Sequence, residues 1–187
     1  RPAVRIAVGH AAPAAAPGDT RPVVGSVAQP ASRSWNGQKP AQQRRIAAAD
    51  FFAGMFETAL AEDEIIRAVH VPSPVSGSRF AIREITRRSG DYAMAGLAAA
   101  ATVADGRIEG LRLVFFALGD APVAATAAAA ALEGSDGTGA ALGRACDALG
   151  QDLAPNDDLN GPAAMKMHLA RVLTRRVVTD LMTGAAV

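Results

Sequence analysis

The chain has 187 residues, half of them hydrophobic, with 19 basic and 18 acidic side chains and a net charge of +1. This length suits one domain or slightly more, and the apolar content is enough for a buried core. The balanced charge excludes a general attraction to nucleic acid or to anionic membranes. A single cysteine, Cys146, excludes an internal disulfide framework, and we expect it to be a small core residue.

The stretch from residue 11 to residue 43 predicts little regular structure. Residues 11–43 hold five prolines and many small side chains, a composition typical of loop or extended chain. The start at Arg1 lacks an initiator methionine and does not resemble a signal peptide, so we expect an internal or trimmed start. No uncharged apolar run of about 18 residues is present, so no membrane span is predicted, and a cytoplasmic setting is the default.

Residues 48–60, AADFFAGMFETAL, predict an amphipathic helix. Asp50 stands where a capping carboxylate would accept the first backbone N–H bonds. The apolar side chains recur at helical spacing. They are Phe51, Phe52, Met55, Phe56, Ala59 and Leu60.

Alternating apolar and polar residues next predict a set of antiparallel strands. The expected strands cover residues 64–71, 79–87, 95–104 and 107–118. The last two are joined by Ala-Asp-Gly, a hairpin turn in which Gly106 accepts a positive φ. In the strand at 79–87, apolar residues are expected to face the core and two arginines to face solvent. The inward set is Phe80, Ile82 and Ile85, and the outward set is Arg83 and Arg87.

The last third of the chain predicts three helices, near residues 121–133, 138–150 and 162–182. Asp120 is the expected cap of the first, which should end near Gly134. The third keeps its cationic side chains opposite its apolar face. These are Lys166, Arg171, Arg175 and Arg176. Strands followed by helices predict an α+β fold, with a three- or four-stranded antiparallel sheet and then a three-helix bundle.

The loop RRSGDY, residues 87–92, is the strongest candidate for chemistry. Arg87 and Arg88 suit phosphates or carboxylates, which guanidinium groups bind through paired hydrogen bonds. The Gly-Asp pair can bring Asp91 and the backbone close to a flat ligand. The alternative is a solvated hairpin with a local Arg–Asp pair.

Other polar clusters favour ordinary structural roles. His10, His70 and His168 share no metal-ligand spacing. Asp157 and Asp158 are typical of a helix-entry loop, and GSDGTG at 134–139 of a connector between helices. Arg175 and Arg176 predict a solvated helix face, with a basic docking surface as the sharper alternative.

Three segments in a fixed order resemble a known family. They are DFFAGMFETALAEDEIIRAVHVP, then FAIREITRRSGDYAMAGLAAAATVADGRI, then PNDDLNGPAAMKMHLARVLTRR. Together they are similar to the FAD-binding medium subunit of the carbon monoxide dehydrogenase and xanthine dehydrogenase family, the molybdenum hydroxylases. RRSGDYA is the most specific piece. The resemblance covers roughly residues 44–182 and implies that 44–187 is the flavoprotein C-terminal α+β domain, with 1–43 an irregular segment or a remnant of the FAD-binding domain.

The resemblance also implies a role for the loop and a set of partners. A molybdenum-binding large subunit would oxidise the substrate, and an iron–sulfur small subunit would pass the electrons to FAD on the medium subunit, which reduces an external acceptor. The loop residues implied to border the flavin are Arg87, Arg88, Asp91 and Tyr92. VVGSVAQPAS at 23–32 is similar to the family's second flavin motif, which implies that Gly25 and Ser26 contact the cofactor.

The first part of the chain departs from the family pattern. The Ala-Gly-Gly pyrophosphate loop is absent, and Val24 stands where the first glycine of the second motif belongs. A β-branched side chain there would obstruct a diphosphate that needs close backbone approach. Two hypotheses follow: a redox subunit that holds or contacts FAD, or a flavin-free module that keeps the fold and docks partner subunits.

Overall fold

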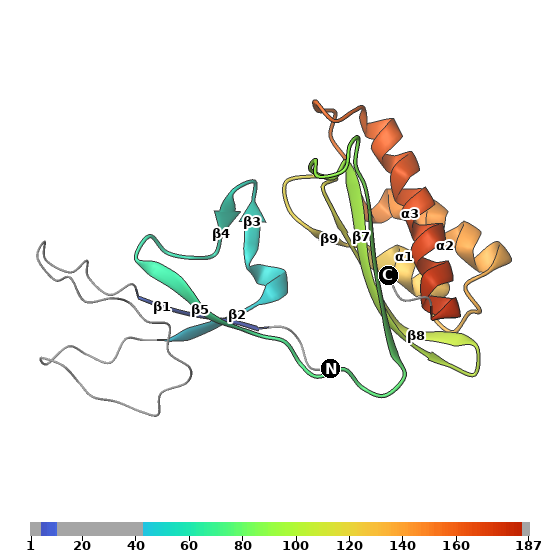
Figure 1. Ribbon diagram of the computed structural model, residues 1–187, viewed down its shortest axis with the longest axis horizontal. Helices are drawn as coiled ribbons and strands as arrows, with labels where there is room; N and C mark the ends of the chain where they lie inside the picture. Colours follow the sequence, from blue (N-terminus) through green and yellow to red (C-terminus); the bar gives the residue numbers. More distant parts are fainter. Residues whose placement is uncertain (1–4, 11–42, 185–187) are drawn as a thin grey trace, which may run out of the picture. The chain divides into compact units, whose positions relative to one another are not determined.

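The computed structural model describes residues 5–10 and 43–184. The chain divides into two compact units, one formed by residues 1–53 and 57–72 and the other by 54–56 and 73–187 (Figure 1). The division expected from the sequence placed residues 44–72 with the C-terminal domain. In the structure, residues 44–47 and 64–70 of this stretch instead pair with the strand at residues 5–10.

The first unit is built on a three-stranded antiparallel sheet. Its central strand is β1 (Arg5–His10), which pairs with β2 (Arg44–Ala47) on one side and β5 (Glu64–His70) on the other. The strand predicted at 64–71 is therefore confirmed, but it belongs to this small sheet. A core of Ile6, Val8, Ile46 and Phe51 lies against the sheet.

The helix predicted at 48–60 is wrong. The segment forms a short 3-10 turn, Ala48–Asp50, and two short paired strands, β3 (Phe52–Gly54) and β4 (Glu57–Thr58). No side chain caps the turn, so Asp50 has no capping role. Phe51 alone of the large apolar side chains is buried, while Phe56 is fully exposed with a φ of 60°. Of the large apolar side chains in this segment, the small core buries one aromatic ring. A helix would need a longer apolar surface to bury its continuous stripe, so the helical spacing does not produce a helix here.

The second unit carries the predicted α+β fold. Its sheet runs β6 (Ser78–Ile85), β7 (Ala95–Ala104), β8 (Arg107–Phe116), β9 (Val123–Ala124), all antiparallel. Asp105 and Gly106 both have positive φ in the β7–β8 turn, as a tight hairpin requires. The helices α1 (Thr126–Leu132), α2 (Gly139–Asp152) and α3 (Ala163–Thr183) cover one face of the sheet (Figure 1).

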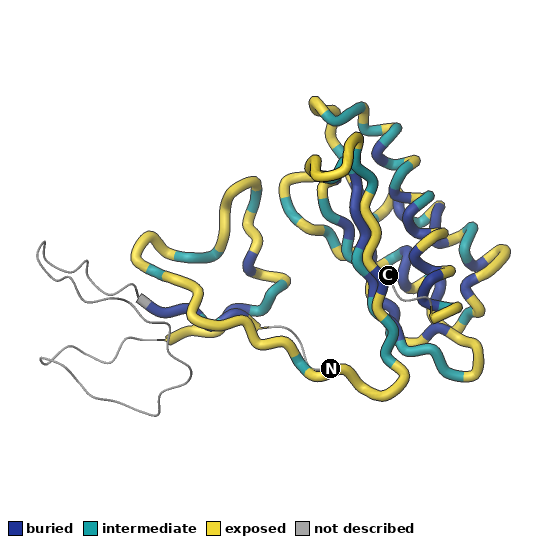
Figure 2. The backbone as a smooth tube through the Cα atoms, viewed as in Figure 1, coloured by how far each residue is buried: buried dark blue, intermediate teal, exposed yellow. Residues whose placement is uncertain are grey.

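The main core lies between this sheet and the helices, where buried segments face each other (Figure 2). Leu97, Leu113 and Phe115 from the strands meet Leu173 and Val177 from α3 in one cluster. Cys146 is buried, as expected. None of the described helices has the length and apolar character that a membrane crossing needs.

The face assignment predicted for β6 is wrong for Phe80, Ile82 and Arg83 but is confirmed for Ile85, which packs against the main core. Phe80 and Ile82 are 62% and 55% exposed, whereas Ala81 is buried. Arg83, on the same side of the strand as Ala81, reaches Asp180 on α3. The helices therefore cover the side of β6 that carries Ala81, Arg83 and Ile85, whereas Phe80 and Ile82 lie on the opposite side.

Three expectations about the helices also need correction. α1 begins at Thr126, not near 121, because residues 123–124 form strand β9. Its free backbone N–H groups donate to Asp152 at the end of α2, from Ala127 and Ala128 at 2.9 Å each, so Asp120 is not the cap. On α3, Lys166 is only 2% exposed, whereas it was expected on the solvent face.

Candidate functional site

The loop between β6 and β7 is a compact structure closed at its base and at its tip. The Met94 N–H donates to the Ile85 carbonyl at 2.8 Å, which joins the two ends of the loop. At the tip, the Asp91 N–H donates to the Arg88 carbonyl at 3.1 Å. Gly90 occupies this turn with a φ of 91°, a conformation that side chains disfavour. The Ser-Gly-Asp sequence therefore sets the backbone positions from which the neighbouring side chains extend.

A second loop, residues 153–162, enters α3. Asp158 and Gly161 exchange backbone hydrogen bonds at 3.0 and 3.2 Å, which places Leu159 and Asn160 at the tip of a tight turn. The Asp158 carboxylate accepts the Asn160 N–H at 2.8 Å. Asp157 accepts the N–H of Ala163, the first residue of α3, at 2.6 Å. Both aspartates thus have the helix-entry role that their sequence predicts.

Arg87 joins the two loops. Its guanidinium donates to the carbonyls of Leu159 at 3.0 Å and Asn160 at 3.2 Å. A hollow of about 280 Å³ lies at this junction. It is lined by Arg87, Gly90, Asp91, Tyr92 and Asn160. We call this the two-loop hollow.

Lys166 fixes the second loop through an ion pair and a hydrogen bond to a backbone carbonyl. Its ammonium lies 2.7 Å from the Asp158 carboxylate and donates to the Asn156 carbonyl at 2.9 Å, although only 2% of the residue is exposed. The Lys166 hydrogen bond is the main reason that the pKa of Asp158 lies below its ordinary value. A buried cation therefore fixes the position of the turn that Arg87 contacts.

The structure brings together three of the four predicted loop residues. Arg87, Asp91 and Tyr92 line the two-loop hollow, and Arg88 lies in the same loop with its side chain exposed. Among the described residues, neither arginine pairs with Asp91, so the local Arg–Asp alternative is not formed. Gly25 and Ser26 lie outside the described residues.

Sequence reasoning missed two participants, Asn160 and Lys166. The only signal for Asn160 was the Asn-Gly pair at a turn. Lys166 carried no signal, because a lysine opening an amphipathic helix is normally solvated. Both depend on contacts across the loop that spacing along the chain does not report.

The side chains around the two-loop hollow are suited to binding a ligand. An exposed carboxylate, an exposed phenol (Tyr92 is 95% exposed) and a fixed guanidinium surround an open surface. These groups suit the edge of a flat polar ligand with hydrogen-bond acceptors. No group of three or more metal-ligating side chains occurs among the described residues. Burial raises the pKa of the Cys146 thiol, which makes it a poor nucleophile.

A protein-family model matches this part of the chain. The CO dehydrogenase flavoprotein C-terminal domain matches residues 80–181, a range that includes both loops, α1, α2 and all but the last two residues of α3. The match covers more than half of the 187 residues.

Curated relatives and a solved structure agree with the family model. The carbon monoxide dehydrogenase medium chain of Afipia carboxidovorans is 30% identical over 139 residues, covering 74% of this chain and 48% of the relative. The nicotine 6-hydroxylase medium subunit of Paenarthrobacter nicotinovorans is 33% identical with the same coverage. The structure of carbon monoxide dehydrogenase from Hydrogenophaga pseudoflava superposes with a TM-score of 0.72 at 30% identity, covering 77% of this chain and 50% of the other. This chain thus spans about half the length of the curated relatives it matches.

Proposed function

The chain belongs to the family of CO dehydrogenase flavoprotein C-terminal domains, and on that premise we propose that it is the flavin-bordering part of a molybdenum hydroxylase medium chain. In this proposal, electrons released by substrate oxidation on a molybdenum-binding large subunit travel through an iron–sulfur small subunit to FAD. The flavin then passes them to an external acceptor. The chain's own contribution is to position and tune the cofactor.

The observation that carries this proposal is the attachment of Arg87 to the second loop. Its two hydrogen bonds to the Leu159 and Asn160 carbonyls hold a cation at the wall of the two-loop hollow. Asp91 and Tyr92 extend from the same wall. A positioned cation beside an open polar surface is what a ligand with a developing negative charge requires.

The residues present fit the edge of a flavin ring. The hollow of about 280 Å³ is too small for a whole dinucleotide, so it would hold only part of FAD. Arg87 and Arg88 would favour negative charge on the ring, and Asp91 would moderate their field. Tyr92 would offer an aromatic surface and a hydroxyl for the ring edge. When bound, the flavin supplies two-electron redox chemistry.

In this proposal, the residues that form or support the two-loop hollow act through binding or electrostatics. Lys166 and Asp158 hold the turn that Arg87 contacts, so they support the hollow without touching the ligand. Gly90 keeps the other loop tight enough for Asp91 and Tyr92 to line the same wall. Gly25 and Ser26 are proposed to contact the diphosphate side of the cofactor, on the family resemblance.

The other candidate is a flavin-free module that docks the partner subunits, favoured by Val24 at a glycine position of the flavin motif. The visible absorption spectrum of the purified protein separates the two. The proposal expects flavin bands that remain with the protein through gel filtration and weaken in Arg87→Ala. A spectrum without these bands, in protein purified together with its partner subunits, would support the docking module.

A further inference from the structure

A second hollow in the same unit lies between the edge strand β6 and helix α3. It measures about 440 Å³ and is lined by Arg83, Arg175, Arg176, Thr179 and Asp180. We call it the arginine hollow. None of these residues takes part in the two-loop hollow, so the proposed function leaves it without a role.

One wall of the arginine hollow is fixed by contacts within the unit. Arg83 binds Asp180 through two hydrogen bonds, of 2.5 and 3.0 Å. Arg79, on the same side of β6, donates to the carbonyls of Leu181 and Met182 at 2.6 Å each. These contacts attach the strand to the last turns of α3 and satisfy Asp180, so the carboxylate is not free for the other arginines.

Arg175 and Arg176, by contrast, are exposed and lack a carboxylate partner among the described residues. The helix dipole does not account for them, because its effect is confined to the last turn and α3 continues to Thr183. The charge is also concentrated: the residues that line the hollow include three arginines and one aspartate, a net charge of +2, against +1 for the whole chain. The hollow therefore combines a fixed frame with two uncompensated guanidinium groups.

The openness of the surface decides what kind of anion it suits. A single small anion on exposed arginines gains little, because water and salt screen each pair. A segment with several carboxylates engages both arginines at once, through the paired hydrogen bonds that guanidinium offers. Arg171, one turn before Arg175, donates from its Nε to the Cys146 carbonyl on α2 at 3.3 Å, so Arg175 and Arg176 are the two guanidinium groups of the hollow that remain available. Two neighbouring guanidinium groups on one open surface fit an extended acidic chain better than a point charge.

We propose that the arginine hollow docks an acidic segment of a partner protein, whose carboxylates pair with Arg175 and Arg176 while Arg83 stays bound to Asp180. The arrangement uses charge complementarity, which sets partner choice and association rate at an exposed interface. The inference does not depend on the presence of flavin.

Fluorescence anisotropy with labelled hexaglutamate, titrated with the whole chain at low salt, tests the proposal. The probe variant is Arg175→Gln/Arg176→Gln, and the charge-matched control is Arg112→Gln/Arg144→Gln. Arg112 lies on β8 and Arg144 on α2, and both are exposed outside the hollow. Thermal unfolding of both variants checks that each remains folded, and labelled hexaglutamine reports binding that does not need charge.

We expect the probe variant to lose about fivefold in affinity and the control variant less than about twofold. Inorganic phosphate at the same concentration of charge should not displace the peptide. Three results would overturn the proposal: no binding by the parent chain, equal losses in the two variants, or displacement by phosphate. The second would indicate the general field of the protein, and the third a small-anion site.

Discussion

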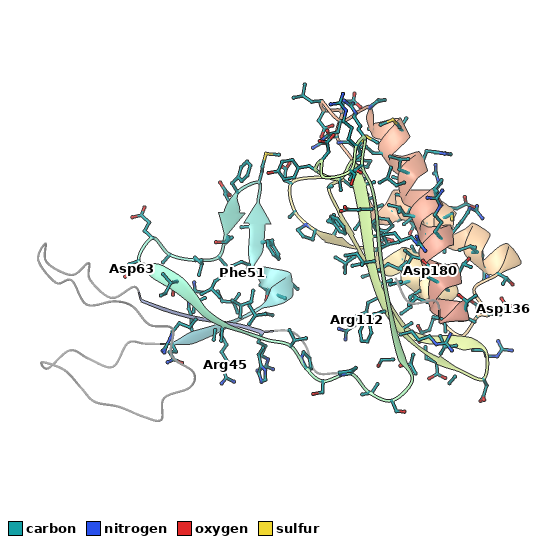
Figure 3. The ribbon with its side chains drawn as sticks, in the orientation of Figure 1. Arg45, Phe51, Asp63, Arg112, Asp136 and Asp180 are labelled. Carbon is teal, nitrogen blue, oxygen red and sulfur yellow. The ribbon has the colours of Figure 1, made fainter. Side chains whose placement is uncertain are left out.

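Arg83 and Asp180 form a bidentate ion pair that joins the edge strand β6 to the last helix α3. Arg83 Nε lies 2.5 Å from Asp180 Oδ2, and a second guanidinium nitrogen lies 3.0 Å from Oδ1. Asp180 projects from α3 on the side of the helix that faces the sheet (Figure 3). Its side chain is 11% exposed and that of Arg83 41%, so the pair is half shielded from water.

This pair predicts an acid-dependent loss of stability. Hydrogen bonding from Arg83 lowers the pKa of Asp180 below its ordinary 3.8, so the carboxylate stabilises the folded state above that pH. The contribution is lost as pH falls through the lowered folded-state pKa. Asp180→Asn should therefore lower the Tm by a few degrees at neutral pH and by much less in acid. Thermal unfolding from about pH 6 to about pH 2 measures this difference in Tm, and a difference that stays constant with pH would contradict it.

Lys166 and Asp158 predict an asymmetry between two substitutions. Asp158→Ala leaves a buried ammonium without its carboxylate, whereas Lys166→Met leaves a carboxylate that is 45% exposed and can be solvated. Breaking a pair costs most when the remaining charge is the buried one. We expect Asp158→Ala to lower the Tm about twice as much as Lys166→Met. The double variant should be less stable than Lys166→Met only by the loss of the hydrogen bond that Asp158 accepts from the Asn160 N–H, and equal effects of the two single changes would refute this account.

Gly96 on β7 lies beneath the ring of Phe116 on β8. A Cβ at this position would lie 2.1 Å from two ring carbons, and an aromatic ring cannot bend away as a flexible chain end can. Gly96→Ala should therefore destabilise the fold by about 1–3 kcal/mol in urea unfolding. Adding Phe116→Ala should make the alanine at 96 nearly harmless, and a full cost in that background would exclude the ring as the cause.

Gly143 in α2 provides the matched control for that experiment. No heavy atom lies within 4 Å of a Cβ built there, and the residue occupies the interior of a helix. Gly143→Ala should stabilise the protein by about 0.5–1 kcal/mol, because alanine loses less backbone entropy in a helix.

Sequence patterns correctly predicted the elements whose structure depends on residues that are neighbours along the chain. The β7–β8 hairpin follows from alternation on both sides of Asp105 and Gly106, whose positive φ values the turn requires. Asp91 was identifiable because the Ser-Gly-Asp turn is itself a local structure, whereas Tyr92 was named by the family resemblance alone. Alternation and helical periodicity likewise predicted that the strands of the second unit precede its helices, and the family resemblance agreed with that order.

The errors arose where a distant part of the chain decides the outcome. Alternation along β6 shows that Phe80 and Ile82 share a face, but not which face the helices cover. Lys166 is buried because the Asn156 carbonyl and Asp158 satisfy its ammonium. α1 needs no cap of its own because Asp152 arrives from the end of the next helix. Helical spacing contains none of this information.

The two arginines of the RRSGDY loop predict separable effects on a bound flavin. Arg88 is exposed without a partner among the described residues, so Arg88→Ala should lower the flavin's reduction potential and leave the Tm unchanged. Losing a cation a few ångströms from the ring costs on the order of 1 kcal/mol, or roughly 20 mV for a two-electron couple. Arg87→Ala should lower the potential similarly but also lower the Tm slightly, because Arg87 holds the Leu159–Asn160 turn. Reductive titration of the flavin-containing protein, with Arg144→Ala as a distant control, measures both effects. Unchanged potentials together with a large loss of Tm would mean that the arginines are structural and that the flavin lies elsewhere.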